Sequence, residues 1–373
     1  MQNVRSPGQP YRLGFAVKVL GDGGLATADM RRWQSGPHLL RSVELLRPVF
    51  DYLARIDVGM YRLSSQVIPY GTHPDLPGLD YRRQLDEADA ALSDLAGEAT
   101  RLGLRLSTHP GQYTVLNATD ATIVDKAIAD LEQDAELLDR LGQPVEGAVV
   151  VHVGGEYGNR PAALDRWERA WARLSDRARA RLALENDERL FGVEDVLELS
   201  RRTGVRVVLD VHHHRIHPTS SGISLEDALA AACATWRGAR PKVHLSSAKT
   251  MLDLAVAAPP RRGTTDSSAA GTGPAPAASA RRPSTGTPTF PPLRAHADLV
   301  APWDLEAVVT AAPVAIDVML EAKAKDLALL HLRRTLAEVR PAVAALEDRP
   351  SGRRRAEPSS KRARLSRPTR LPP

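Results

Sequence analysis

The sequence predicts a closed barrel of eight parallel β-strands that alternate with α-helices, and three observations lead to this prediction. Short runs of Leu, Val and Ile, the composition of strands buried on both faces, recur along the chain. Stretches with helical spacing separate these runs. His, Asp and Glu stand where many of the runs end, as in LRLSTH, VVVHVGG and LALEND. The carboxyl ends of the strands are where such barrels place their active sites, so the pattern favours a metalloenzyme.

Each element follows from its own stretch of sequence, taken in order. The apolar runs expected to form strands are 12–19, 58–65, 104–109, 147–154, 182–187, 205–211, 242–247 and 313–321. The stretches with helical spacing that follow them are 43–56, 80–102, 120–141, 161–178, 193–202, 224–236, a short helix from about 303, and 325–339. Eight strand-helix units in alternation predict one (β/α)8 TIM barrel.

Two segments fall outside this alternation. Residues 255–294 are rich in Ala, Pro, Ser, Thr and Gly and carry almost no large apolar side chains, which predicts a disordered insertion before the last strand. Residues 348–373 form a basic tail that is also expected to be disordered. The barrel domain is therefore expected over 11–254 and 295–347, after a flexible N-terminus of residues 1–10.

The charge and the composition limit the possible partners and compartments. The net charge is +5, but residues 349–373 alone contribute +8, so the rest of the chain sums to −3. The tail could attract nucleic acid without sequence preference, or it could be a solvated end. The single cysteine, Cys233, excludes a disulfide within the chain and fits a reducing cytosol. Neither a signal peptide nor a membrane span is expected, which predicts a soluble cytoplasmic protein and no membrane partner.

Candidate metal ligands form a set of five imidazoles and three carboxylates. They are His109, His152, Glu185, Asp210, His213, His244, His296 and Glu321. An isolated histidine at a strand end is more often a structural hydrogen-bonding group, but six of these residues end six different strands, which a barrel gathers around one axis. Eight ligands exceed one four-coordinate site and suit several divalent ions with bridging carboxylates. Manganese, zinc or magnesium fit imidazole and oxygen donors, and such clusters catalyse in-line displacement at phosphorus.

Seven motifs, in order, resemble the UV damage endonuclease family, whose members are TIM-barrel DNA-repair nucleases related in architecture to endonuclease IV. They are RLSSQVIPYGTHP, STHPGQYTVLN, VVHVGGEYGNR, LALEND, LDVHHHRIHP, KVHLSS and DVMLEAKAKD. The resemblance covers residues 11 to 345 apart from the insertion. It implies a repair endonuclease that cuts the phosphodiester immediately 5′ to UV photoproducts, cyclobutane dimers and 6-4 products, and leaves 3′-hydroxyl and 5′-phosphate ends. It also implies a cluster of three metal ions, often manganese.

The resemblance implies roles for particular residues. Within LDVHHHRIHP it places Asp210 and His213 on metal, whereas His212, His214 and His217 would orient the ligands or lie at the surface. Glu185, Lys242 and His73 would be catalytic; Lys242 can be carboxylated in this family, and His73 would meet a phosphate. Gln112 and Tyr113 would probe or wedge into the duplex at the lesion. The other interpretations are a lysine that pairs with phosphate or reaches solvent, a histidine that caps a turn, and a tyrosine packed on the barrel rim.

Phe15 stands where some family members carry a tyrosine near the DNA, so a stacking contact without the hydroxyl is expected. The insertion and the tail have no counterpart in the family. The implied partner is double-stranded DNA containing UV lesions, bound by a monomer associated with the nucleoid.

Three alternatives stay open at this point. An abasic-site endonuclease of the endonuclease IV type would differ in the lesion that it selects. A sugar isomerase on the same barrel would turn over a sugar and ignore DNA, which the Gln112 and Tyr113 loop argues against. A barrel that binds nucleic acid without cutting it would be expected to have lost ligands, whereas this set is intact.

Overall fold

The computed structural model describes residues 8–217, 222–249 and 294–350. Its strands are β1 Tyr11–Ala16, β2 Met60–Arg62, β3 Arg105–Ser107, β4 Val149–His152, β5 Leu182–Glu185, β6 Arg206–Asp210, β7 Lys242–Leu245 and β8 Ile316–Leu320. Its α-helices are α1 Leu39–Arg55, α2 Tyr81–Glu87, α3 Asp89–Arg101, α4 Ala121–Arg140, α5 Arg160–Trp171, α6 Asp176–Arg181, α7 Val193–Thr203, α8 Val211–Ile216, α9 Leu225–Ala234, α10 Pro302–Ala311, α11 Lys325–Val339 and α12 Pro341–Ala344. Short 3₁₀ turns lie at η1 Trp33–Ser35 and η2 Pro77–Leu79.

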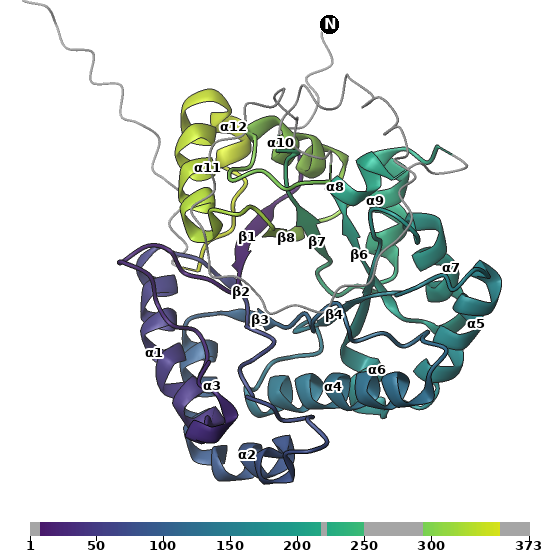
Figure 1. Ribbon diagram of the computed structural model, residues 1–373. Coiled ribbons are helices and arrows are strands. Elements are labelled where there is room, and N and C mark those ends of the chain that lie inside the picture. Colours follow the sequence, from purple (N-terminus) through teal and green to yellow (C-terminus); the bar gives the residue numbers. More distant parts are fainter. Residues whose placement is uncertain (1–7, 218–221, 250–293, 351–373) are drawn as a thin grey trace, which may run out of the picture.

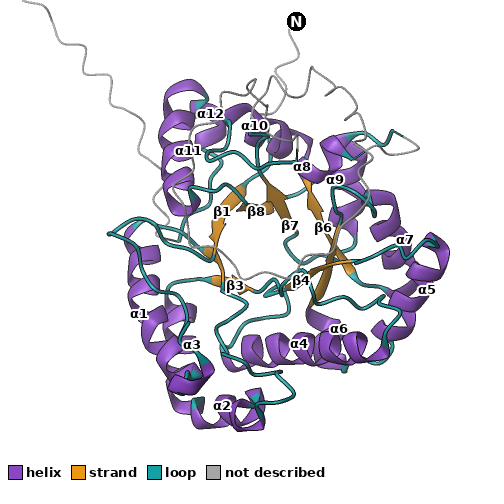
Figure 2. Cartoon of the chain, in the orientation of Figure 1, coloured by secondary structure: helices purple, strands orange, loops and turns teal. Residues whose placement is uncertain are grey.

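The eight strands form one parallel sheet that curls into a barrel surrounded by helices (Figures 1 and 2). The strand order is β3-β2-β1-β8-β7-β6-β5-β4. An isolated parallel bridge between Thr108 and Val149 joins the two ends, with Val150 N–H donating to the Thr108 carbonyl at 3.0 Å. The predicted TIM-barrel fold is confirmed, and it brings the carboxyl ends of all the strands to one mouth.

Alternation along the strands separates the main core from the barrel interior. Outward side chains such as Leu13, Val151 and Val318 join the large hydrophobic cluster between sheet and helices. Two smaller buried hydrophobic clusters are separate from this main core. One contains Val150, Val208 and their neighbours, and the other consists of Ala16, Met60 and Met319. Side chains thus fill the interior of the barrel, and polar residues form the layer of side chains nearest the mouth.

An ion-pair layer crosses the barrel near the amino ends of the strands. The Asp317 side chain is fully buried and accepts hydrogen bonds from Arg12 Nε at 3.0 Å and Arg105 Nη1 at 2.6 Å. Arg240 Nε lies 2.8 Å from the same carboxylate. Because these residues come from β1, β3, β8 and the segment just before β7, the layer ties opposite walls of the barrel together below the mouth.

Several expected boundaries differ from the structure. Helix α1 begins four residues earlier than predicted, because His38 caps its first turn by accepting a hydrogen bond from Leu40 N–H. The predicted helix 80–102 is broken at Ala88 into α2 and α3, and 161–178 is interrupted before α6, where Ser175 caps a new helix. The strand predicted to end at residue 211 instead turns into α8, which Asp210 caps.

The barrel domain also extends a few residues beyond its expected limits at both ends. Gln9 N–H donates to the Val309 carbonyl at 2.8 Å, and Asp348 N–H donates to the Tyr11 carbonyl at 2.7 Å. Gln9 and Asp348 therefore pack with the barrel, just beyond the expected limits of residues 11 and 347. Most of the predicted insertion and basic tail lies outside the described residues. Among the described residues, no helix has both the length and the apolarity needed to cross a bilayer.

Candidate metal centre

Glu185, the last residue of β5, lies at the centre of the predicted ligand set. Its Oε2 lies 3.0 Å from His109 Nε2 and 3.7 Å from His152 Nε2. Its Oε1 lies 2.8 Å from His244 Nδ1. The carboxylate therefore faces histidines on both sides, because β3 and β4 end on one side of the mouth and β7 on the other.

Two groups of side chains share Glu185, and each can offer ligand atoms to one ion. His109, His152 and Glu185 place one ligand atom each within 4.8 Å of one another. Glu185, Asp210, His244 and Glu321 do the same. Six of the eight predicted ligands thus form two adjoining groups with a carboxylate between them, which is the arrangement expected for bridged divalent ions.

The remaining two predicted ligands, His213 and His296, lie beside these groups. His213 is on α8, with Nδ1 3.8 Å from Asp210 Oδ2 and 3.0 Å from the Asn186 carbonyl. His296 returns to the mouth through an antiparallel bridge with Ala248, and its ring centroid lies 5.8 Å from that of His213. The structure therefore brings all eight predicted ligands to one end of the barrel, although neither of these two joins a group within 4.8 Å.

Burial and mutual charge shift the pKa values of the centre in opposite directions. Burial raises the pKa of Asp210 to about 8, and the charges of Glu185 and Glu321 add to the rise. Burial alone would lower the pKa of His213, but Asp210 and Glu185 outweigh it and raise that pKa to about 9. Burial would also raise the pKa of Glu185, yet the neighbouring His244 and His152 charges hold it well below its usual range.

Lys242 crosses the barrel interior below the ligand groups. Its side chain comes from β7, is fully buried, and donates a hydrogen bond from Nζ to Ser107 Oγ of β3 at 2.7 Å. Burial lowers the pKa of Lys242 well below its usual range, and the charges of Arg62 and Arg105 lower it further. Alternation places Lys242 on the same side of β7 as His244, as predicted. The lowered pKa of Lys242 favours its neutral amine form.

The donor set suits a hard or borderline divalent cation. Buried ligand atoms without a hydrogen-bond partner in the described structure include Asp210 Oδ2, His152 Nδ1 and His296 Nδ1. A buried polar atom without a partner is costly unless something binds it, and a cation would satisfy the carboxylate oxygen. No thiolate lies near, because Cys233 is buried in α9. These residues can therefore hold divalent metal ions through imidazole and carboxylate ligands.

The loop after β3 presents the predicted DNA-probing pair to solvent. Tyr113 is 81% exposed, and Gln112 beside it is also exposed. They follow His109 by a few residues, so the same loop carries a ligand and an uncovered aromatic ring. His73 is also exposed, but its Nδ1 accepts a hydrogen bond from Asp75 N–H at 3.3 Å. That contact is the turn-capping arrangement, and no described ion pair joins His73 to the ligand groups.

The predicted DNA contact of Phe15 is wrong in this structure. The Phe15 ring is fully buried and packs edge-on against Tyr61 at 5.4 Å between centroids. On β1 the side chain of Arg12 points into the barrel towards Asp317, so alternation turns Phe15 outward under the helices. A residue on that face cannot reach DNA at the mouth.

Sequence reasoning missed three residues that hold the site together. Arg62, at the end of β2, forms an ion pair with Glu321. Asn186 donates from Nδ2 to the Asp210 carbonyl at 3.0 Å and accepts from Asp210 N–H at 2.8 Å, which links β5 to β6. Ser107 receives the Lys242 hydrogen bond. Arg62 and Asn186 stand within the quoted motifs at strand ends, which is the signal that could have identified them.

Comparison with known proteins identifies a family for this chain. The sequence model of the family described as "UV-endonuclease UvdE" matches residues 40–257. A protein named UV DNA damage endonuclease from Bacillus velezensis is 29% identical over 306 residues, which are 78% of each chain. A UV-damage endonuclease from Neurospora crassa is 35% identical over 202 residues, 51% of this chain and 30% of that protein.

A solved structure agrees with these matches. The crystal structure of SacUVDE superposes with a TM-score of 0.67 at 25% sequence identity. The match covers 88% of this chain and 99% of that one. The similarity therefore extends over the whole barrel as well as over the motifs at its mouth.

Proposed function

This chain belongs to the UV-endonuclease UvdE family, and from that premise we propose that it cuts duplex DNA immediately 5′ to a UV photoproduct. It is a DNA endonuclease of the UV-damage repair class. The cut hydrolyses one phosphodiester and leaves a 3′-hydroxyl and a 5′-phosphate. Cyclobutane pyrimidine dimers and 6-4 photoproducts are the proposed lesions.

The observation that carries this proposal is the position of Glu185 between two groups of ligands, one of which includes His109 at the start of the loop that carries the exposed Tyr113. The two groups provide for adjacent divalent ions, and we propose three ions, with manganese favoured over zinc or magnesium. When bound, such ions lower the pKa of a water molecule and stabilise negative charge on the scissile phosphate. His213 and His296 would complete the coordination at the edge of the groups.

The protein residues then have distinct tasks. Glu185, Asp210 and Glu321 would hold the ions, and Arg62 keeps the Glu321 carboxylate in place through their ion pair. Lys242 is a buried amine whose lowered pKa favours the neutral form. A neutral amine can take up CO₂ and release a proton, which yields an N-carboxylate, and we propose that modification as its role at the centre.

Lesion recognition is assigned to the loop after β3. An exposed Tyr113 with Gln112 beside it can enter a duplex where damage has weakened stacking, because extruding bases there costs less than in intact DNA. Selectivity then depends on distortion rather than on sequence. We also propose that the enzyme acts as a monomer on nucleoid DNA in the cytoplasm.

A nicking assay tests the proposal directly. An end-labelled duplex with one cyclobutane dimer is incubated with the protein and manganese, beside undamaged and abasic duplexes, and again with chelator. Manganese-dependent cutting 5′ to the dimer is expected. Cutting of the abasic duplex alone would replace the proposal by an endonuclease IV type of activity, and no cutting of any duplex would overturn it.

A further inference from the structure

Four consecutive loops at the end of the barrel that carries the ligand groups each contain an exposed aromatic side chain. Trp33, Tyr70, Tyr113 and Tyr157 are 49%, 38%, 81% and 50% exposed. They lie in the segments that follow β1, β2, β3 and β4, so each belongs to a loop on the side of the ligand groups. Among the described residues, every other aromatic ring except that of Trp303 is buried.

The β1–α1 loop, residues 17–38, is held in a fixed shape by a buried carboxylate. Asp29 is 4% exposed and accepts hydrogen bonds from Arg31 Nε at 2.8 Å and from His38 N–H at 3.0 Å. Its own N–H donates to Ser42 Oγ of α1 at 2.9 Å. The loop is therefore preorganised, and binding through it costs little ordering entropy.

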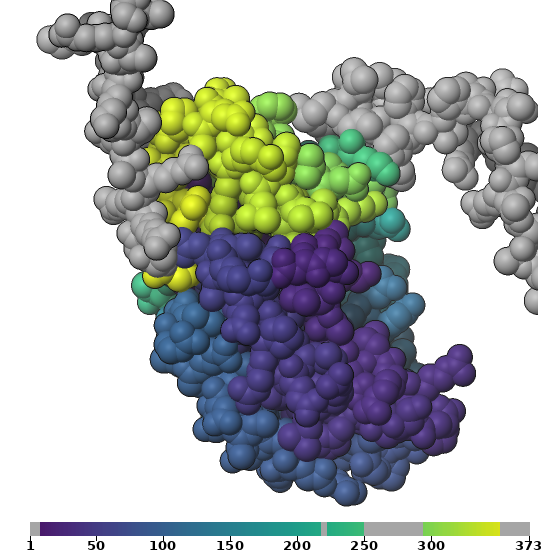
Figure 3. All heavy atoms as spheres, turned by 90° about the vertical axis from the view of Figure 1, so that its left-hand side faces the viewer, coloured from purple at the N-terminus to yellow at the C-terminus, as the bar shows by residue number. Residues whose placement is uncertain are grey.

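This loop turns an aromatic ring and a cation towards solvent. Met30 is 67% exposed and Trp33 is 49% exposed. The segment 30–41, MRRWQSGPHLLR, contains three arginines and no acidic residue. Arg31 is paired with Asp29 and Arg41 with Glu44, whereas the Arg32 guanidinium makes no hydrogen bond or ion pair with the described residues. Figure 3 shows this N-terminal part of the chain, in purple, at the molecular surface.

We propose that Trp33 stacks on a base unpaired beside the lesion while Arg32 contacts a neighbouring backbone phosphate, an inference that rests on the proposed function. Aromatic rings stack on any exposed base without sequence preference, and an unpaired arginine beside them attracts phosphate. Strand β1 is separated from β3 by β2, so this contact lies apart from the Tyr113 loop around the mouth. The enzyme would then hold the opened duplex at two places.

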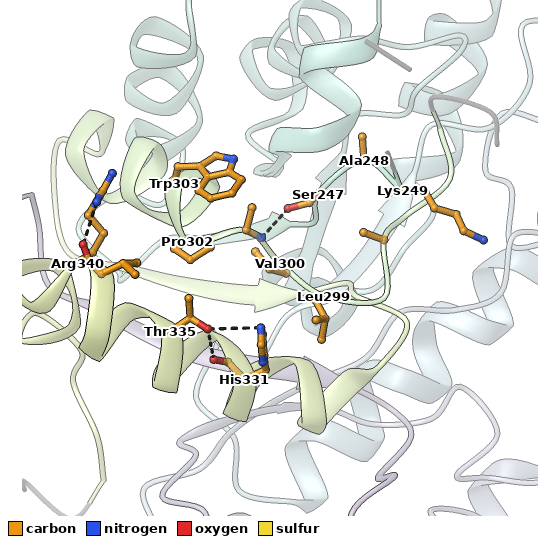
Figure 4. A pocket seen from close by; sticks show the side chains of 13 residues that line it. Ser247, Ala248, Lys249, Leu299, Val300, Pro302, Trp303, His331, Thr335 and Arg340 are labelled. Atoms are coloured by element: carbon orange, nitrogen blue, oxygen red, sulfur yellow. Dashed lines mark hydrogen bonds between the residues drawn. The ribbon is translucent and has the colours of Figure 1, made fainter. Parts of the chain in front are cut away.

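Trp303 offers a matched control. It is 52% exposed, much like Trp33, but it comes from another part of the chain and lies with Val300 and Arg340 in a groove between α10 and α11 (Figure 4). The other tryptophans, Trp167, Trp171 and Trp236, are buried. A change in tryptophan fluorescence on adding DNA can therefore be attributed to Trp33 by comparing Trp33→Phe with Trp303→Phe.

The test measures DNA binding by the full chain in chelator, with fluorescent duplexes that do or do not carry one dimer. Trp33→Ala is expected to weaken binding of the lesion duplex about tenfold and binding of the undamaged duplex much less. Arg32→Gln should weaken both equally and reduce the slope of log Kd against log salt by about 1. DNA should quench the fluorescence of wild type and of Trp303→Phe, and this quenching should be largely absent in Trp33→Phe.

The possible failures are distinguishable. Equal weakening of both duplexes by Trp33→Ala would overturn stacking on an unpaired base. Unchanged affinity of Trp33→Ala for both duplexes, together with full fluorescence quenching in Trp33→Phe, would overturn the contact altogether. Manganese-dependent nicking by the wild type would in that case leave the proposed function standing. A wild type that neither binds nor nicks any duplex would overturn both. Melting curves of each variant confirm that the fold is retained.

Discussion

At the scale of single residues, Glu185 is the side chain that both ligand groups share. Glu185→Gln keeps the shape but removes the charge that binds cations, so nicking is expected to fall by at least about 100-fold. The affinity of this variant for manganese, measured by calorimetry, should also fall, and its melting temperature in chelator should change little. Glu306→Gln on the outer surface of α10 is the control. Wild-type nicking by Glu185→Gln would refute the site assignment.

Tyr113 has a different role, because its ring is uncovered and makes no described contact with the ligand groups. Tyr113→Ala is expected to lower the ratio of affinity for lesion duplex to affinity for undamaged duplex by about tenfold. Manganese binding and stability should be unchanged, and Tyr113→Phe should keep the ratio. An unchanged ratio in Tyr113→Ala would remove the wedge from the mechanism.

Asp210 and His213 make the stability of the metal-free protein depend on pH. Their folded pKa values, about 8 and about 9, exceed the ordinary values of 3.8 and 6.5. The folded state therefore holds more protons than the unfolded state, and this contribution to stability is lost as pH rises through the folded values. In chelator, wild type is expected to lose stability relative to Asp210→Asn between about pH 4 and pH 9, from the ordinary pKa of Asp210 up to the folded pKa of His213. Urea unfolding at several pH values measures the difference, and a constant difference would contradict it.

At the scale of elements, the two segments that flank residues 250–293 lie side by side. Lys249 N–H donates to the Ala295 carbonyl at 2.8 Å, and Ala297 N–H to the Ser247 carbonyl at 2.9 Å. Replacing 250–293 by a short Gly/Ser linker should keep His296 in place and preserve nicking. The shorter loop should raise stability by about 1–2 kcal/mol through a lower closure entropy. A lower melting temperature or lost activity would show that this segment contributes contacts of its own.

At the scale of the whole molecule, the Asp317 layer ties the walls of the barrel together far from the mouth. Asp317→Asn would leave the buried Arg105 without its charge partner, which is expected to cost about 3 kcal/mol of unfolding free energy. Nicking at temperatures below the transition should persist, because the ligands are at the other end. Asp176→Asn on the surface is the control in urea unfolding. Unchanged stability of Asp317→Asn would contradict the role of the layer.

The fold was largely predictable because period and composition are local properties. Buried parallel strands are continuous apolar runs, and candidate ligands at the ends of six of these runs indicate one shared mouth. Boundaries were less predictable, since His38 and Ser175 set helix starts through single hydrogen bonds. The turn from β6 into α8 was missed because LDV continues the apolar run.

The sequence by itself determined the eight-stranded barrel and the eight candidate ligands, and it placed Gln112 and Tyr113 in a loop at the mouth; the structure showed that this loop is exposed. Only the tertiary structure decided that Glu185 lies between two ligand groups, that Arg62 pairs with Glu321 and that Lys242 reaches Ser107 across the barrel. It also turned Phe15 away from the mouth and Trp33 into solvent. The reason is physical: strand ends can be located from local pattern, but distances across a barrel and the direction of a side chain depend on strand register and on packing between segments far apart in the chain.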